Sequence, residues 1–245
     1  MTHANIALLL LLSQVSLPRA TADTLEEFSA YYSATTNGIR GAAERHLVRL
    51  TERNYRLNVS LEAKLGGLAI GDLEQASEFS YADGQIKPLT YSYQVSGVSS
   101  AAETVVFNWD AMLAMSADDK QSWSVVINSN TLDELSYQLA LALDIADPSK
   151  TTYSYETIDG NALGQISLRV LGEDIISTPL GYFRCVKLER YRGASSSRTT
   201  TIWLALDWSN LLAKIEQTTA SGLAITMELT NALIAGQQMT GLTDW

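Results

Sequence analysis

The chain has 245 residues, 46% of them hydrophobic, and its 17 Lys and Arg against 27 Asp and Glu give a formal net charge of −10. This charge repels phosphate backbones and anionic membrane surfaces, so we expect no nucleic-acid partner. Cys185 is the only cysteine, which excludes an intramolecular disulfide. Its neighbours have a strand-like pattern, which predicts a buried, unreactive thiol.

The first 22 residues predict a secretory signal peptide. An apolar run begins at Ile6 and is closed by Pro18, and Ala20-Thr21-Ala22 has the small residues that a signal peptidase needs. The run is well short of the ~20 apolar residues of a membrane-spanning helix. No cysteine comes directly after this run, which argues against a lipid-anchored lipoprotein. We therefore expect cleavage after Ala22, a periplasmic location and no stable membrane insertion.

Beyond this leader the dominant hydrophobic period is two. The clearest strand lies at 55–65, where apolar residues alternate with polar ones and predict one face in an apolar interior. Turn residues such as Asn37-Gly38, Asp83-Gly84 and Ser221-Gly222 separate segments of this kind. Similar alternation occurs at 89–95, 105–109, 123–127, 166–170 and 223–229. This spacing of strands and turns is typical of antiparallel meanders.

One segment has a helical period instead. Leucines recur at three- and four-residue spacing from Leu132 to Leu143, Asn130 or Thr131 is a suitable N-cap, and Asp133 and Glu134 fall in the first turn. Asp147-Pro148 then forms a stop signal. We predict a helix over 132–143. It serves either as a lid across the open end of a curved sheet or, the favoured reading, as a cover for sheet core.

The sequence therefore predicts a mostly β protein, an antiparallel curved sheet or half-barrel with one short helix around 132–143. We expect residues 23–235 to form a single β-rich domain. Two β-meander halves, 23–128 and 150–235, joined by the helix are the alternative organisation. Residues 236–245 have the composition of a loosely held, flexible tail.

The strand at 199–206 is apolar on both faces. Ile202 and Leu204 point to one side, and Trp203 and Ala205 point to the other. A strand of this kind is either covered by protein on both faces or lines a cavity.

Several segments resemble the domain of unknown function 3108 family of exported bacterial proteins. The main match is 173–188, with the sequence EDIISTPLGYFRCVKL, followed by 203–207 and 211–216. Residues 28–32 and 80–88 are also similar to the family. The resemblance covers nearly all of the chain after the leader.

This resemblance implies an envelope protein dominated by antiparallel β structure, with no established activity and no catalytic residues to carry over. The chain departs from the family at Ala213, where proline is usual. This departure bears on the entry to a strand and not on any known chemistry.

The residues themselves contain no catalytic constellation, so we expect no enzyme, no metal and no cofactor. His46 is the only histidine after the leader, which excludes a two-histidine zinc site. Glu44 lies on the same strand face, and we expect a hydrogen-bonded surface histidine. An enzyme acting on polysaccharide would have to use His46, Glu173 or Asp207, and surface roles are favoured for all three.

Our leading functional hypothesis is non-catalytic binding of an apolar or amphipathic envelope molecule in the concavity of the sheet. Aromatic residues on strand faces are the candidate ligand wall. They are Tyr91, Tyr93, Phe107, Trp109, Tyr153, Tyr155 and Trp203. The alternatives are that these rings form a filled core, or that the protein interacts with an envelope protein through a sheet edge or surface patch.

Overall fold

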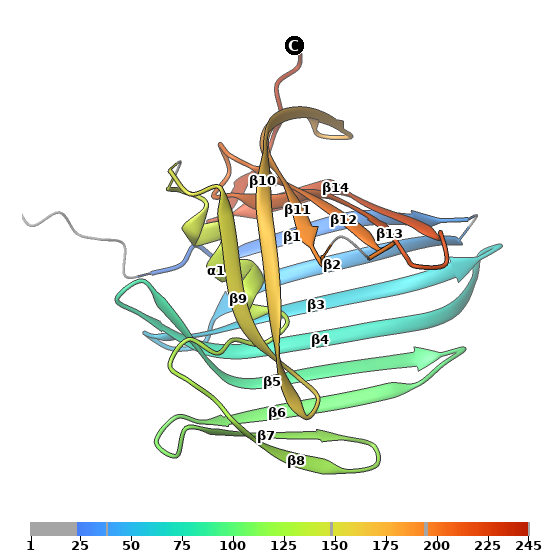
Figure 1. Cartoon of the computed structure of the whole chain (residues 1–245). Helices are drawn as coiled ribbons and strands as arrows, with labels where there is room; N and C mark the ends of the chain where they lie inside the picture. The colour runs from blue at the N-terminus through green and yellow to red at the C-terminus, as the bar shows by residue number, and fades with distance from the viewer. Residues whose placement is uncertain (1–23, 38, 148, 194–195, 245) are drawn as a thin grey trace, which may run out of the picture.

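The computed structural model of the protein describes residues 24–37, 39–147, 149–193 and 196–244 (Figure 1). The predicted signal peptide lies outside these residues. The first eight strands follow one another directly and are β1 (Phe28–Thr36), β2 (Ile39–Arg49), β3 (Asn54–Leu65), β4 (Leu68–Ala82), β5 (Gln85–Gly97), β6 (Ala101–Asn108), β7 (Leu113–Asp118) and β8 (Ser122–Val126). The remaining elements are α1 (Ser136–Asp144), β9 (Thr152–Asp159), β10 (Ala162–Thr178), β11 (Gly181–Tyr191), β12 (Thr199–Ala205), β13 (Leu211–Thr218), β14 (Ala224–Ile234) and β15 (Gln237–Gln238).

All the strands belong to one antiparallel sheet, whose two ends are β8 and β9. Strands β1–β8 form one meander and β9–β14 form a second. The two meanders join where β1 pairs with β14, in a register that runs from Phe28 opposite Ile234 to Thr35 opposite Thr226. The predicted curved, mostly β fold is confirmed, and both meanders share this single open sheet.

The alternation at 55–65 places Tyr55 and Leu57 in the interior with no exposed surface. It does not hold to the end of the strand, because Leu65 is 52% exposed and Leu68, across the turn, is 75% exposed. The β3–β4 hairpin is long and its tip projects to the right in Figure 1, away from α1. Residues at the tip therefore have no interior to enter, although their sequence pattern continues.

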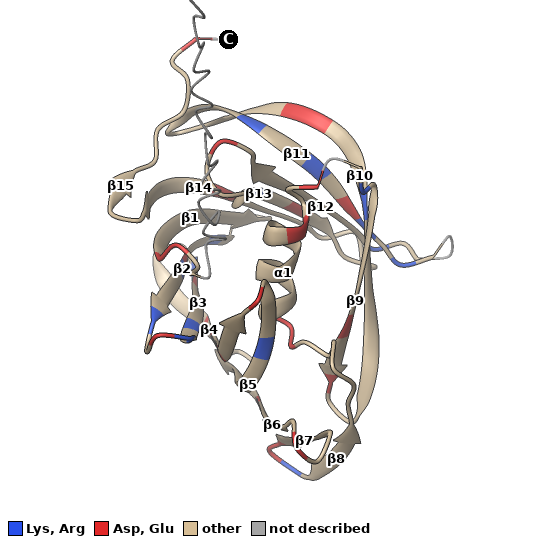
Figure 2. Cartoon of the chain, turned by 90° about the vertical axis from the view of Figure 1, so that its left-hand side faces the viewer, with Lys and Arg blue, Asp and Glu red and all other residues tan. Residues whose placement is uncertain are grey.

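The helix α1 lies inside the curve of the sheet (Figure 2). It is shorter at its start than the predicted 132–143, because Leu132 pairs with the edge strand β9. The Leu132 N–H donates to the Glu156 carbonyl, and the Ile158 N–H donates to the Leu132 carbonyl. The helix therefore begins at Ser136 and ends at Asp144.

Asp133 has a different role from the one expected for it in the first helical turn. Its Oδ1 accepts hydrogen bonds from the backbone N–H groups of Leu135 (2.9 Å) and Ser136 (2.7 Å). Its Oδ2 accepts one from Ser77 Oγ on β4 at 2.6 Å. The Asp133 side chain thus satisfies free N–H groups at the helix start and ties them to the sheet. The expected cap Thr131 donates to Glu156 instead.

The C-terminal segment is not the loose tail that its composition predicts. Residues Gln237 and Gln238 form β15 against β14, Met239 is fully buried, and Leu242 forms a β-bridge with Tyr182. The crossing is close at Gly241, where an added Cβ would lie 2.6 Å from the Gly181 carbonyl carbon. Because both residues are glycine, the two backbones approach closely enough to exchange hydrogen bonds.

We expect Asp133→Ala to lower the free energy of unfolding by about 2 kcal/mol, because it removes the cap and leaves buried donors unpaired. Asp133→Asn should fold nearly as well, since its amide can accept from the backbone and donate to Ser77. Urea denaturation followed by circular dichroism measures both effects.

The pH dependence of Asp133→Asn gives a further check. Burial raises the pKa of the Asp133 carboxyl, and hydrogen bonds from Ser77 and the helix start oppose this. The group therefore contributes stability below the pKa of the unfolded chain, and that contribution is lost as the pH rises through the folded-state pKa. Wild type should lose stability relative to Asp133→Asn as the pH rises. A difference that does not change with pH would contradict this assignment.

Candidate functional site

A cavity of about 410 Å³ lies between α1 and the part of the sheet where the two meanders join. We call it the seam cavity. The segment before β1, β1, β2 and β4 contribute Thr24, Leu25, Glu26, Phe28, Arg45, Leu47 and Tyr81. The helix contributes Tyr137, Gln138, Leu139, Leu141, Ala142 and Leu143. Strands β12–β14 and the turn after β12 contribute Ile202, Leu204, Ser209, Asn210, Leu211, Leu212, Ile215, Met227 and Ile234.

The wall of the seam cavity is mainly aliphatic. Strand alternation explains this on the sheet side, since Ile202 and Leu204 are two residues apart and face the same interior. They are 9% and 5% exposed. Trp203 and Ala205, between and beyond them, are buried in a second apolar cluster. The two alternatives given for this strand therefore occur together in β12, whose faces are both buried and whose inner face also lines a cavity.

The mouth of the cavity is marked by its exposed lining residues, Thr24, Glu26, Leu143 and Ser209. They come from the segment before β1, the end of α1 and the turn after β12. Ser209 Oγ donates to the Glu26 carboxylate at 2.6 Å, which joins two sides of the mouth. Asn210 Nδ2 donates to the Ala142 carbonyl at 2.8 Å and holds the end of the helix against the same turn.

Arg45 is the charged residue inside the seam cavity. It lies on β2 between Ala43 and Leu47, which are each 2% exposed, and is itself 8% exposed. Its Nη1 donates to Gln138 Oε1 on α1 at 2.6 Å. Its Nε is buried and has no hydrogen-bond partner among the described residues. An arginine at an inward-facing strand position between Ala43 and Leu47 is a signal in the sequence that a prediction based on aromatic residues did not use.

None of the seven aromatic residues predicted as a ligand wall lines the seam cavity. Tyr91, Phe107, Tyr153 and Tyr155 are buried members of the main core. Tyr93 and Trp109 are partly buried and pack against that core. The rings fill the interior between the N-terminal meander and β9, which is the filled-core alternative for these residues.

The polar atoms of these rings have local partners. Trp109 Nε1 donates to the Pro88 carbonyl at 2.7 Å, and its ring stacks on Phe107 with centroids 5.7 Å apart. Gln75 Nε2 donates to the Tyr91 hydroxyl at 2.9 Å. Burial raises the pKa of Tyr91 well above its usual range. Tyr91 and Trp109 are thus satisfied by protein groups.

Tyr155 supports the seam cavity indirectly. Its hydroxyl donates to Asp144 Oδ2 at the end of α1, at 2.8 Å. Burial raises its pKa, and the hydrogen bond to Asp144 adds to this effect. The ring thus holds the helix that forms one wall of the cavity, without touching the cavity itself.

Trp203 lies in the second cluster, with Cys185. Its Nε1 donates to Asp174 Oδ2 at 3.0 Å, which lowers the pKa of that carboxyl. The ammonium groups of Lys187 and Lys214 lie 5.0 and 5.4 Å from its ring centre. These contacts make Trp203 part of a packed outer layer. Cys185 is fully buried, and burial raises the pKa of its thiol to about 12, as expected of a structural cysteine.

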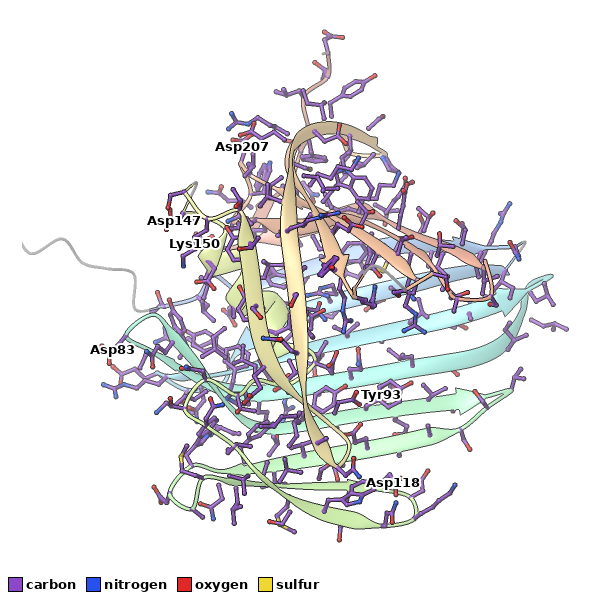
Figure 3. All side chains as sticks on the ribbon, in the orientation of Figure 1. Asp83, Tyr93, Asp118, Asp147, Lys150 and Asp207 are labelled. Carbon is purple, nitrogen blue, oxygen red and sulfur yellow. The ribbon has the colours of Figure 1, made fainter. Side chains whose placement is uncertain are left out.

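The residues considered for an enzyme do not form one site. Asp207 pairs with Arg184 at 2.9 Å on the surface. Glu173 is exposed on β10, and His46 on β2 contacts Glu44 and Ser29, each at 3.0 Å. The expected contact between His46 and Glu44 is present. Figure 3 shows Asp207 far from Tyr93, the one predicted ligand residue labelled there.

The described residues contain no group of three or more His, Cys, Asp or Glu side chains placed to hold a metal ion. They also contain no helix that is long and apolar enough to cross a membrane.

Solved structures similar to this chain include a β-barrel-like protein of domain of unknown function DUF1849 from Brucella abortus. It is 9% identical, with a TM-score of 0.56 over 86% of this chain and 98% of that one. At this identity the likeness shows the fold alone. A Bacteroides fragilis protein described as exported, with a YmcC-like fold, is 10% identical over 85% of this chain and 96% of its own. Its TM-score of 0.41 is too low to bear on this chain.

Comparison with curated proteins gave no match. The family model for proteins of unknown function DUF3108 matches residues 27–230, which include every strand from β1 to β13 and most of β14. The match agrees with the resemblance noted in the segments at 80–88 and 173–188. The chain therefore belongs to the DUF3108 family.

Proposed function

We propose that the protein binds an apolar or amphipathic molecule in the seam cavity and performs no chemistry on it. The observation that carries this proposal is a mainly aliphatic cavity of about 410 Å³ between α1 and the sheet. Ligand sites in proteins are concave, mostly apolar and usually about 300–1,000 Å³ in volume. The seam cavity has this character.

The position of α1 supports the proposal. The helix contributes both apolar and polar lining residues, and its end lies at the mouth beside Ser209 and Asn210. A helix that only covered sheet core would leave no space beneath it. A helix that acts as a lid therefore accounts for the cavity better than a helix that only covers sheet core, the alternative favoured from the sequence.

The envelope is the proposed place of action. This part of the proposal rests on the predicted signal peptide at 1–22, which would direct export of the chain and be cleaved after Ala22. Binding of an apolar molecule would be useful there, because such molecules are poorly soluble between membranes.

Uncharged alkyl alcohols provide a direct test of the cavity. Octanol, decanol and dodecanol should bind with affinity rising roughly fourfold per added methylene, since each buried CH₂ contributes about 0.8 kcal/mol. Isothermal titration calorimetry of the purified protein measures the series. An affinity that does not depend on chain length would contradict binding inside an apolar cavity.

Filling the cavity should abolish this binding. Ala142→Phe places a ring among the lining residues at the mouth and should weaken dodecanol binding at least about tenfold. Ala146→Phe is the matched control, because Ala146 is exposed and lies just beyond α1. The control should bind as wild type does. Equal binding by the two variants would place the ligand elsewhere.

Trp203→Phe separates the outer layer from the cavity. It removes the hydrogen bond to Asp174 and part of a buried ring, so we expect the free energy of unfolding to fall by about 1–2 kcal/mol. Dodecanol affinity should stay unchanged. A stable variant with weakened binding would restore Trp203 as a ligand residue, and thermal unfolding with calorimetry distinguishes the two results.

A second candidate function is interaction with another envelope protein at the free edge of the sheet. β8 ends the sheet, and Val106, Met115 and Val126 near it are 53%, 50% and 71% exposed. An apolar surface next to an unpaired strand can add a partner strand. A photo-reactive residue at position 126 should then cross-link to one protein in the envelope. Cross-linking no more specific than at exposed Ser221 would count against this candidate.

A further inference from the structure

We infer that the molecule held in the seam cavity is an anionic amphiphile, whose carboxylate or phosphate group binds the guanidinium of Arg45 while its alkyl chain lies along the aliphatic wall. This inference rests on the proposed function and adds the chemical class of the ligand.

Among the residues that the structure describes, the buried Arg45 guanidinium has no counter-charge. Arginine stays protonated in proteins and carries five N–H donors. The single side-chain partner found for Arg45 among the described residues is the neutral amide of Gln138. Nε is buried and unpartnered, and no carboxylate of the described residues forms an ion pair with Arg45.

Other arginines of the chain show the opposite arrangement. Arg56 pairs with Glu78, Arg169 pairs with Glu189, and Arg184 pairs with Asp207. Each of these three side chains is 44–53% exposed, so water would solvate the charge even without the carboxylate. Although the chain has 27 acidic residues, these carboxylates pair with exposed arginines, whose charge water already solvates. The buried guanidinium is left with capacity to bind an anion.

The acidic groups around the cavity do not neutralise Arg45. Glu26 is the one carboxylate among the described lining residues, and it is exposed at the mouth, where it accepts from Ser209. In the turn before α1, Glu134 is partly buried, and its main charged neighbour is Arg190. Tyr32 and Tyr137 also face Arg45, and burial raises the pKa of each, so both remain neutral.

An unpaired buried charge is costly, and an apolar side chain of similar volume usually costs less. Packing in β2 therefore gives no reason for an arginine between Ala43 and Leu47. An anion that enters the cavity gives a reason. Two oxygens of a carboxylate or phosphate can accept from the planar guanidinium fork, which makes charge-assisted hydrogen bonds in a region shielded from water.

The rest of the wall determines what carries this anion. Leu204, Leu212, Ile215 and Met227 offer no polar side-chain group, so a small hydrated anion would lose its water without compensation there. An alkyl chain gains from the same surface. A single molecule with both parts, such as a fatty acid or an alkyl phosphate, matches Arg45 and the aliphatic wall together.

The test compares three ligands of one chain length, dodecanoate, dodecyl phosphate and dodecanol, at neutral pH by calorimetry. Wild type should bind at least one of the two anions about tenfold or more tighter than dodecanol, as expected for hydrogen bonds to a charged group. Comparing the two anions shows whether the head group is a carboxylate or a phosphate. This measurement needs no variant.

Arg45→Met then assigns the preference to one residue. The variant should bind dodecanol as wild type does, bind the anion no better than the alcohol, and unfold at a higher temperature because a buried unpaired charge is gone. Arg184→Met is the matched control, since it removes the same charge from an exposed pair with Asp207. The control should keep the full preference for the anion.

Two results would overturn the inference. If the wild-type protein binds dodecanol as tightly as it binds both anions, it has no anion site, but the proposed function of the cavity still stands. An anion preference that survives in Arg45→Met places the head group elsewhere. If none of the three ligands binds, the proposed function fails together with the inference.

Discussion

The pairing of β1 with β14 is the interaction on which the rest of the structure depends. It joins strands that are about 200 residues apart in the chain, with Phe28 opposite Ile234. Without it the two meanders would be separate open sheets, each with an apolar face toward water. With it they form one curved wall, and α1 lies inside the curve (Figure 2). The seam cavity lies beside this junction, since β1, β2 and β12–β14 line it.

The cavity follows from a mismatch in size between the wall and the helix. The nine residues of α1 span a length of about 13 Å. The sheet that encloses the helix is much wider, since it has 15 strands. Asp133 fixes the start of the helix against β4, and Tyr155 and Asn210 hold its end. A short helix held at both ends cannot move to fill the whole concavity. Aliphatic side chains line what it leaves open.

The aromatic residues predicted as a ligand wall and the aliphatic residues that line the seam cavity have separate roles. The rings of Tyr91, Phe107 and Trp109 fill the part of the core built by the N-terminal meander. Large rings bury much apolar area, and the polar atoms of Tyr91 and Trp109 find nearby protein partners. The seam cavity is lined mainly by Leu, Ile and Met side chains. Aromatic content alone therefore did not locate the seam cavity, because a ring on a strand face serves core and ligand equally well.

The sequence by itself determined the elements that depend on near neighbours. Period-two alternation is a property of single strands, and it correctly predicted the mostly β fold and two apolar faces around Trp203. Turn-forming residues correctly predicted the turns at Asp83-Gly84 and Ser221-Gly222. The helix was also recognised, although Asp133 and Leu132 bind the sheet and so delay its start. Only the tertiary structure decided which faces meet. The junction of β1 with β14, the docking of Met239 and the enclosure of Arg45 all join residues far apart in the chain. No local pattern records such contacts, because they depend on how the whole sheet curves.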